Sequence, residues 1–178
     1  LHRRLGGRLR VIASGGAALD PKLERKWNAL GFTVLQGYGL TETSPVVTTN
    51  TEQSRRPGSV GRALPGVQAC IAPDGEILVK GASVFQGYFR DPERTRAAFT
   101  DDGWYRTGDI GELDRDGYLY IRGRKKYMIL GPGGQNVYPE DVETELAKVA
   151  GVRDACVLGL EKPNGQIEIH AVLLLKTE

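Results

Sequence analysis

The sequence predicts the end of a large α/β domain that carries a small antiparallel β-subdomain and is followed by a truncated, small α+β domain. Three observations support this fold class. A strand–helix–strand pattern fills residues 1–50, short strands between turn residues fill 51–124, and a helix followed by two strands fills 125–178. We expect these ranges to be the three parts of the chain.

The pattern of the first part, residues 1–50, predicts a βαβ unit. A short apolar strand at 9–13 ends in Ser14-Gly15-Gly16, and a second strand at 32–35 runs into Gly37-Tyr38-Gly39. Asp20 is a suitable N-cap for the helix between them, and a proline follows it. That helix has an apolar face of Leu23, Trp27 and Leu30. If the strands are parallel, both glycine turns lie at the edge where such folds bind ligands.

The second part changes to an antiparallel pattern. Residues 75–80 read as a strand after a turn, and the turn 114–117 leads into another strand at 118–121. Asp91, with a proline after it, caps one short helix. These signals predict a small, mainly antiparallel β-subdomain.

The third part begins after a basic run. A glycine-rich loop at 131–134 precedes a helix that starts near Pro139. Two strands follow, at 155–160 and 167–175, with turn residues between them. This pattern predicts a helix packed on a hairpin.

Composition excludes several function classes. The 24 basic and 22 acidic residues nearly balance, so nucleic acid is not an expected partner. The arginines among residues 3–10 indicate a solvated helix end more than a nucleic-acid or lipid patch. Cys70 and Cys156 lie far apart with no histidine cluster, so we expect free thiols in a reducing cytoplasm, not a disulfide or zinc site.

The chain opens with a basic segment that imitates a signal peptide. Its apolar stretch is short and is broken by Ser14-Gly15-Gly16, and the first residue is Leu1 instead of Met. We therefore expect an internal segment of a longer protein. No apolar run approaches the roughly 20 residues that span a bilayer.

The stretch 36–39 has residues that suit a purine. The Tyr38 ring offers a flat stacking face, and the Gln36 amide can pair with the edge of adenine. Gly37 and Gly39 allow the backbone to approach a ligand closely. The alternative is a tight turn with a core tyrosine.

The next residues suit a phosphate and its metal ion. Thr41 offers a hydroxyl to a phosphate oxygen, and Glu42 offers a hard oxygen ligand to Mg²⁺. Farther along, Asp109 could accept hydrogen bonds from two ribose hydroxyls, or could satisfy its own turn instead.

Together, the stretches 36–43, 105–109 and 123–126 resemble the adenylate-forming superfamily, which includes acyl-CoA synthetases, luciferases and peptide-synthetase adenylation domains. The resemblance covers essentially the whole chain. It implies that a carboxylate attacks ATP, releases pyrophosphate and becomes an acyl-adenylate. It also implies an adenine pocket lined by Gly15, Gly16 and Ala17, and a ribose bound by Asp109 and Arg124.

The resemblance further implies a hinge at Lys126, where a small C-terminal lid domain would rotate between adenylation and thioester formation. Tyr127 departs slightly from long-chain relatives, which are often acidic there. The loop with Gly133 and Gly134 would approach the pantetheine tunnel of CoA. A solvated charge run and a plain helix start are the alternatives for these two segments.

The details look most like long-chain fatty-acid–CoA ligases, which implies fatty acid, ATP with Mg²⁺, and CoA as small-molecule substrates and cofactors. The family's phosphate-binding loop and catalytic lysine have no match in this chain, since Lys176 lies in a different context. We therefore expect this piece alone to be inactive. Long-chain relatives often work at membrane surfaces, although no segment here indicates it.

Two other functions stay open. A ligase could pass its adenylate to a carrier protein instead of CoA. A non-catalytic module could bind adenine nucleotides without turnover. The residues do not indicate the acyl chain length or the oligomeric state.

Overall fold

The computed structural model describes residues 1–131, 135–163, 165 and 167–176, which divide into two compact units. The first unit is Leu1–Thr107 with Gly111–Ile121, and the second is Gly108–Ile110 with Arg122–Glu178. The expected division into three parts stays a prediction.

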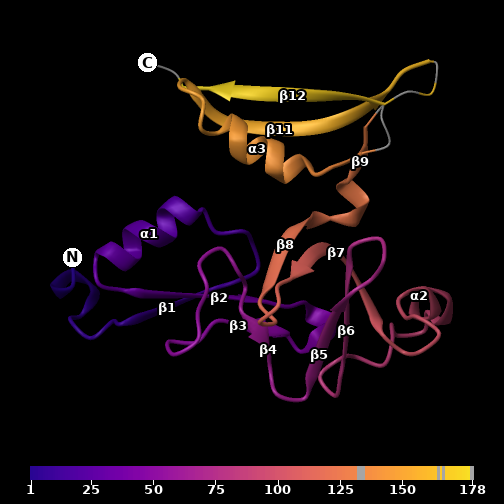
Figure 1. Cartoon of the computed structure of the whole chain (residues 1–178), viewed down its shortest axis with the longest axis horizontal. Helices are drawn as coiled ribbons and strands as arrows, with labels where there is room; N and C mark the ends of the chain where they lie inside the picture. Colours follow the sequence, from indigo (N-terminus) through magenta and orange to yellow (C-terminus); the bar gives the residue numbers. More distant parts are fainter. Residues whose placement is uncertain (132–134, 164, 166, 177–178) are drawn as a thin grey trace. The chain divides into compact units, whose positions relative to one another are not determined.

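The first unit begins with the βαβ pattern. A 3₁₀ turn, η1 (Arg3–Leu5), precedes β1 (Val11–Ser14), α1 (Pro21–Ala29) and β2 (Thr33–Tyr38) (Figure 1). Strands β1 and β2 are parallel, with Val11 opposite Thr33 and Ser14 opposite Gln36. Strands β3 (Thr48–Thr49) and β4 (Arg62–Ala63) extend the sheet antiparallel in the order β1-β2-β3-β4. The predicted βαβ unit is confirmed.

The buried face of helix α1 differs from the predicted one. The Asp20 carboxylate caps the helix by accepting from Lys22 N at 2.7 Å, as expected. Trp27 packs edge-on against the buried ring of Phe32. However, Leu23 and Leu30 are 43% and 49% exposed, and they do not pack with Trp27 as one buried face. The buried residue of α1 is instead Glu24, which has a polar partner on the sheet.

A second four-stranded sheet has the order β5-β6-β7-β8. Its strands are Val67–Ile71, Glu76–Gly81, Tyr105–Leu113 and Leu119–Arg124. Helix α2 (Pro92–Ala97) is capped by Asp91, which accepts from Arg94 N at 3.0 Å. Four fully buried side chains form the core of this unit: Val47, Ile77, Val79 and Leu119. The antiparallel subdomain and its short helix are therefore confirmed.

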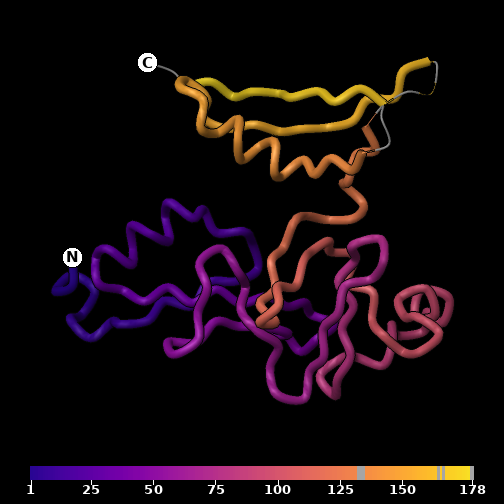
Figure 2. Tube along the Cα trace, in the orientation of Figure 1, coloured from indigo at the N-terminus to yellow at the C-terminus, as the bar shows by residue number. Residues whose placement is uncertain are grey.

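The second unit places one helix along a hairpin (Figure 2). After η3 (Lys125–Tyr127), strands β9 (Ile129–Leu130) and β10 (Asn136–Val137) pair antiparallel. The remaining elements are α3 (Pro139–Leu146), β11 (Val152–Glu161) and β12 (Ile167–Leu175). Val157 N donates to Glu143 Oε1 at 2.8 Å, which ties β11 to α3. This arrangement confirms the predicted helix on a hairpin.

Two chemical expectations concern the whole chain. Both cysteines are free thiols, and burial raises the pKa of the Cys70 thiol, which makes it less reactive at neutral pH. Among the described residues, no helix is both long enough and apolar enough to cross a bilayer.

Candidate functional site

The two predicted glycine turns lie side by side at the carboxyl ends of β1 and β2. A Cβ atom built on Gly15 would lie 3.2 Å from the carbonyl oxygen of Gly37. Gly16 has a φ of +81°, a left-handed conformation that glycine adopts without strain. Gly15, Gly16 and Ala17 are all exposed, so their backbone groups are open to a ligand.

Gln36 is directed toward helix α1. Its side-chain nitrogen donates to Glu24 Oε2 at 2.9 Å, and both residues are buried. The predicted contact with an adenine edge needs this same amide. One of its donors is already used inside the protein, and the adenine contact of Gln36 stays a prediction.

The chain after β2 folds back tightly on itself. A Cβ atom on Gly39 would lie 1.7 Å from Pro45 O, which no side chain could tolerate without moving the backbone. Val47 N donates to Tyr38 O at 2.8 Å and closes the turn. Tyr38 is half-buried and packs against the core.

Glu42 lies in the short 3₁₀ turn η2 (Thr41–Thr43), between an exposed and a buried threonine. The Glu42 carboxylate is half-buried, and its Oε1 accepts from the hydroxyl of Tyr88 at 3.0 Å. Its backbone carbonyl accepts from Phe85 N at 2.8 Å. The segment 85–88 therefore holds both the main chain and the side chain of Glu42.

Asp109 and Arg124 form an ion pair within the second unit. Asp109 is 4% exposed, and its Oδ1 accepts from Arg124 Nε at 2.8 Å. Gly108, immediately before Asp109, has a φ of +71°, so the strand bends there in a way that favours glycine. The sequence predicted that these two residues act on one ribose, and the structure places them in contact.

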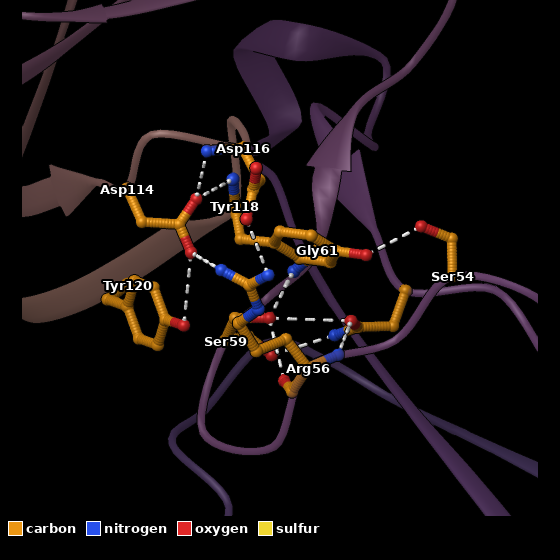
Figure 3. Close-up of polar contacts among 9 residues, drawn as sticks. Ser54, Arg56, Ser59, Gly61, Asp114, Asp116, Tyr118 and Tyr120 are labelled. Carbon is orange, nitrogen blue, oxygen red and sulfur yellow. Dashed lines mark hydrogen bonds and ion pairs between the residues drawn. The ribbon is translucent and has the colours of Figure 1, made fainter.

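A separate polar cluster fixes the loop 50–61 to the β7–β8 turn (Figure 3). The Arg56 guanidinium lies 4.4 Å from the centre of the Tyr118 ring and pairs with Asp114 and Asp116. Asp114 Oδ1 also accepts from the backbone nitrogens of Asp116 and Tyr118, each at 2.9 Å. Ser54 and Tyr118 join their hydroxyls at 2.6 Å.

The cluster changes the ionisation of its charged groups. Partial burial raises the pKa of Asp114, but the hydrogen bonds from Tyr118 N, Arg56 and Asp116 N outweigh it and lower that pKa below its ordinary value of 3.8. Hydrogen bonds raise the pKa of Arg56, and the bond to Asp116 has a larger effect than the bond to Asp114. The cluster is therefore built around a charged Asp114.

Comparison with known proteins assigns the family. A family model described as AMP-binding enzyme matches residues 1–89, half of the chain. The chain belongs to the AMP-binding enzyme family.

Relatives of this family match almost the whole chain. A long-chain-fatty-acid–CoA ligase, FadD15 of Mycobacterium bovis, is 44% identical over 92% of the chain and 27% of its own length. A sulfoacetate–CoA ligase of Cupriavidus necator is 38% identical over 98% of the chain and 36% of its own length. The chain thus spans about a third or less of these AMP-binding relatives.

Solved structures of AMP-binding enzymes share the fold. ATP-bound MatB from Rhodopseudomonas palustris is 39% identical with a TM-score of 0.87, covering 97% of this chain and 37% of MatB. O-succinylbenzoate coenzyme A synthetase from Bacillus subtilis, in complex with ATP and magnesium ion, is 34% identical with a TM-score of 0.83. The match covers 95% of this chain and 37% of that synthetase. These matches confirm the predicted superfamily and fold class.

The predicted hinge residue lies in the second unit. Lys126 is exposed in η3, and its ammonium lies 4.6 Å from the centre of the Tyr127 ring. A hinge role for Lys126 stays a prediction. Gly133 and Gly134, assigned to the CoA tunnel, lie outside the described residues.

The donor set around Glu42 fits a magnesium ion that arrives with a nucleotide. Among the described residues there is no group of three or more His, Cys, Asp or Glu side chains that could hold a metal. Mg²⁺ commonly takes one or two carboxylates together with substrate phosphates and waters. A single half-buried carboxylate beside an exposed threonine hydroxyl meets that requirement.

Tyr88 was not identified from the sequence. It lies 46 residues beyond Glu42, and no periodicity or motif of the sequence connects the two. The only local signal is its position just before the Asp91 cap of α2, which predicts a turn and gives no partner for its hydroxyl.

Proposed function

We propose that this chain is part of an AMP-forming acyl-CoA ligase. The ligase converts a carboxylic acid and ATP to an acyl-adenylate and pyrophosphate, and the thiol of CoA then displaces AMP. The observation that carries the proposal is the match of nearly the whole chain to CoA ligases at 38–44% identity. The held carboxylate of Glu42 and the ion pair between buried Asp109 and Arg124 support it.

In the proposed ligase, the nucleotide is bound by residues of both units. The backbone at Gly15, Gly16 and Ala17, with Gly37 and Gly39, lines the adenine, and the Tyr38 ring stacks on it. Asp109 and Arg124 bind the ribose, because a carboxylate accepts from hydroxyls and a guanidinium donates to oxygen. Each of these residues binds or orients and takes no proton from the substrate.

Thr41 and Glu42 act at the phosphates. The Thr41 hydroxyl donates to a phosphate oxygen, and Glu42 ligates Mg²⁺. When bound, the cation stabilises negative charge on the phosphate oxygens as pyrophosphate leaves. Glu42 supplies a carboxylate oxygen whose position is fixed by Tyr88.

For the acid, we propose a long-chain fatty acid. The support is the higher identity to FadD15 of Mycobacterium bovis than to the sulfoacetate–CoA ligase. We propose that the protein acts in the cytoplasm, where CoA is available and cysteines stay reduced.

The test uses the full-length protein and a panel of short to long carboxylic acids. AMP and acyl-CoA are measured by mass spectrometry with CoA present and absent. We expect acyl-CoA from long acids only. Adenylate without thioester would indicate a carrier-dependent ligase, and no product from any acid would favour a nucleotide-binding module.

A further inference from the structure

The segment that contacts Glu42 carries a residue outside the proposed nucleotide contacts. Tyr88 donates its hydroxyl to Glu42 Oε1 at 3.0 Å, while Phe85 N donates to the Glu42 carbonyl at 2.8 Å. Two bonds from one segment fix both the position of the backbone and the rotamer of the carboxylate. A half-buried carboxylate gains orientation from such a donor.

Tyr88 is itself fixed by helix α2. Its backbone nitrogen donates to Thr95 Oγ1 at 2.8 Å, and the Thr95 hydroxyl donates to Asp91 O at 2.7 Å. A Cβ atom on Gly87 would lie 2.5 Å from Thr95, so glycine allows the segment to approach the helix. The capped start of α2 therefore fixes the position of the Tyr88 backbone.

The Tyr88 ring is held on its face and its edge. The Arg94 guanidinium lies 4.0 Å from the ring centre, and the Phe85 ring packs against it in a T-shape at 4.8 Å. These contacts aim the hydroxyl at Glu42. An arginine or lysine in place of Tyr88 would neutralise the carboxylate, whereas a neutral phenol leaves its negative charge for a cation.

We propose that Tyr88 is a positioning residue that holds the Glu42 carboxylate in the orientation in which it ligates Mg²⁺ bound with ATP. The proposal rests on the role of Glu42 in the proposed function. Phenylalanine at position 88 keeps the ring contacts with Arg94 and Phe85 and removes only the hydrogen bond. The carboxylate then samples other rotamers, and metal binding weakens.

The experiment compares Tyr88→Phe, Glu42→Gln and the double variant in the full-length protein. Mn²⁺ binding is measured by electron paramagnetic resonance in the presence of an α,β-methylene analogue of ATP. The matched control is Tyr118→Phe. This variant also loses one part-buried hydroxyl contact, which joins Tyr118 to Ser54 at 2.6 Å and does not involve Glu42. The Mg²⁺ concentration that half-saturates adenylate formation is measured in parallel.

We expect Tyr88→Phe to weaken Mn²⁺ binding by about 10-fold or more, within the range found when an outer partner of a metal ligand is removed. The half-saturating Mg²⁺ concentration should rise, and kcat at saturating Mg²⁺ should change less. The double variant should bind Mn²⁺ no more weakly than Glu42→Gln. Tyr118→Phe should bind Mn²⁺ like the wild type.

Other results would overturn the proposal in distinguishable ways. Normal Mn²⁺ binding in Tyr88→Phe, with weak binding in Glu42→Gln, would reject positioning and leave the proposed function intact. Normal binding in Glu42→Gln would remove Glu42 from the metal site and end both assignments. An equal loss in Tyr88→Phe and Tyr118→Phe would show a general effect of losing a tyrosine hydroxyl.

Discussion

At the residue scale, the two candidate carboxylates, one in each unit, are held in different ways. Glu42 is half-buried and accepts from the neutral hydroxyl of Tyr88, whereas Asp109 is buried and paired with the cation Arg124. The neutral partner leaves the charge of Glu42 for a metal ion. The cation Arg124 holds Asp109 Oδ1 at 2.8 Å, and its own side chain is about half exposed.

We predict that Asp109→Ala in the full-length protein raises KM for ATP. The change removes up to two charge-assisted hydrogen bonds to the ribose, each worth about 1.5–3 kcal/mol. Steady-state kinetics with varied ATP measure the effect. We expect at least a roughly tenfold rise, since about 1.4 kcal/mol is tenfold in affinity.

Controls separate ribose binding from folding, because Asp109 also holds Arg124. Asp109→Asn keeps the shape and should show the same direction of change in KM. Asp116→Ala removes an exposed partner of Arg56 and should leave KM for ATP unchanged. Wild-type ATP kinetics in both Asp109 variants would remove Asp109 from the site.

At the scale of elements, local chemistry decided how much the sequence could predict. The caps at Asp20 and Asp91 and the turn that begins at Asp114 depend on neighbours within a few residues, and all were predicted. The contacts of Glu24 with Gln36 and of Tyr88 with Glu42 join residues of different elements, 12 and 46 positions apart. No helical or strand periodicity encodes such pairs, so the buried face of α1 was mispredicted.

The site residues also differ in how far the sequence could predict their contacts. Asp109 and Arg124 were expected together from family resemblance, and the structure places them in contact. Gly15 and Gly37 were expected at one edge, because parallel strands bring their carboxyl ends together. Tyr88 was missed because its role depends on how α2 packs, which no local pattern shows.

The Arg56 cluster predicts a pH dependence of stability. The pKa of Asp114 is lowered in the folded protein, so its ionised form stabilises the fold above the ordinary pKa of 3.8. This contribution is lost as the pH falls below 3.8 toward the lowered value. The midpoint of thermal unfolding should therefore drop over this pH range.

The comparison with variants isolates this carboxylate from the others in the protein. Asp114→Asn should lower the midpoint at pH 6 and flatten its decline below pH 4. Asp116→Asn, which loses one partner of Arg56 but keeps the bonds of Asp114 to backbone nitrogens, should decline as the wild type does. Parallel curves for Asp114→Asn and the wild type would contradict the assigned role.

At the scale of the whole molecule, the chain consists of two compact units, and β7 and β8 contribute residues to both. Lys126 lies shortly after the end of β8, in the second unit. The proposed hinge would allow one protein to perform two half-reactions in turn. That proposal concerns motion and is tested by kinetics.

We predict that Lys126→Pro slows thioester formation more than adenylation in the full-length protein. Proline fixes φ at about −65° and restricts the preceding residue, so rotation about this segment is hindered. Rapid-quench measurements of each half-reaction provide the rates. Lys126→Ala, which keeps a free φ, should affect both far less, and an equal loss in both half-reactions for Lys126→Pro would argue against a hinge.

The tight turn at Gly39 has a consequence for how this sequence can vary. With Pro45 O only 1.7 Å from where a Cβ would lie, no other amino acid fits unless the segment 39–45 opens, whereas a Cβ on Gly37 would meet Thr48 O at 3.1 Å. Consider a library that randomises 36–43 and is sorted for protease resistance alone, without nucleotide. Glycine should dominate the survivors at 39, and alanine should be recovered more often at 37. A residue that looks like part of a ligand motif would thus be retained by folding before any ligand selects for it.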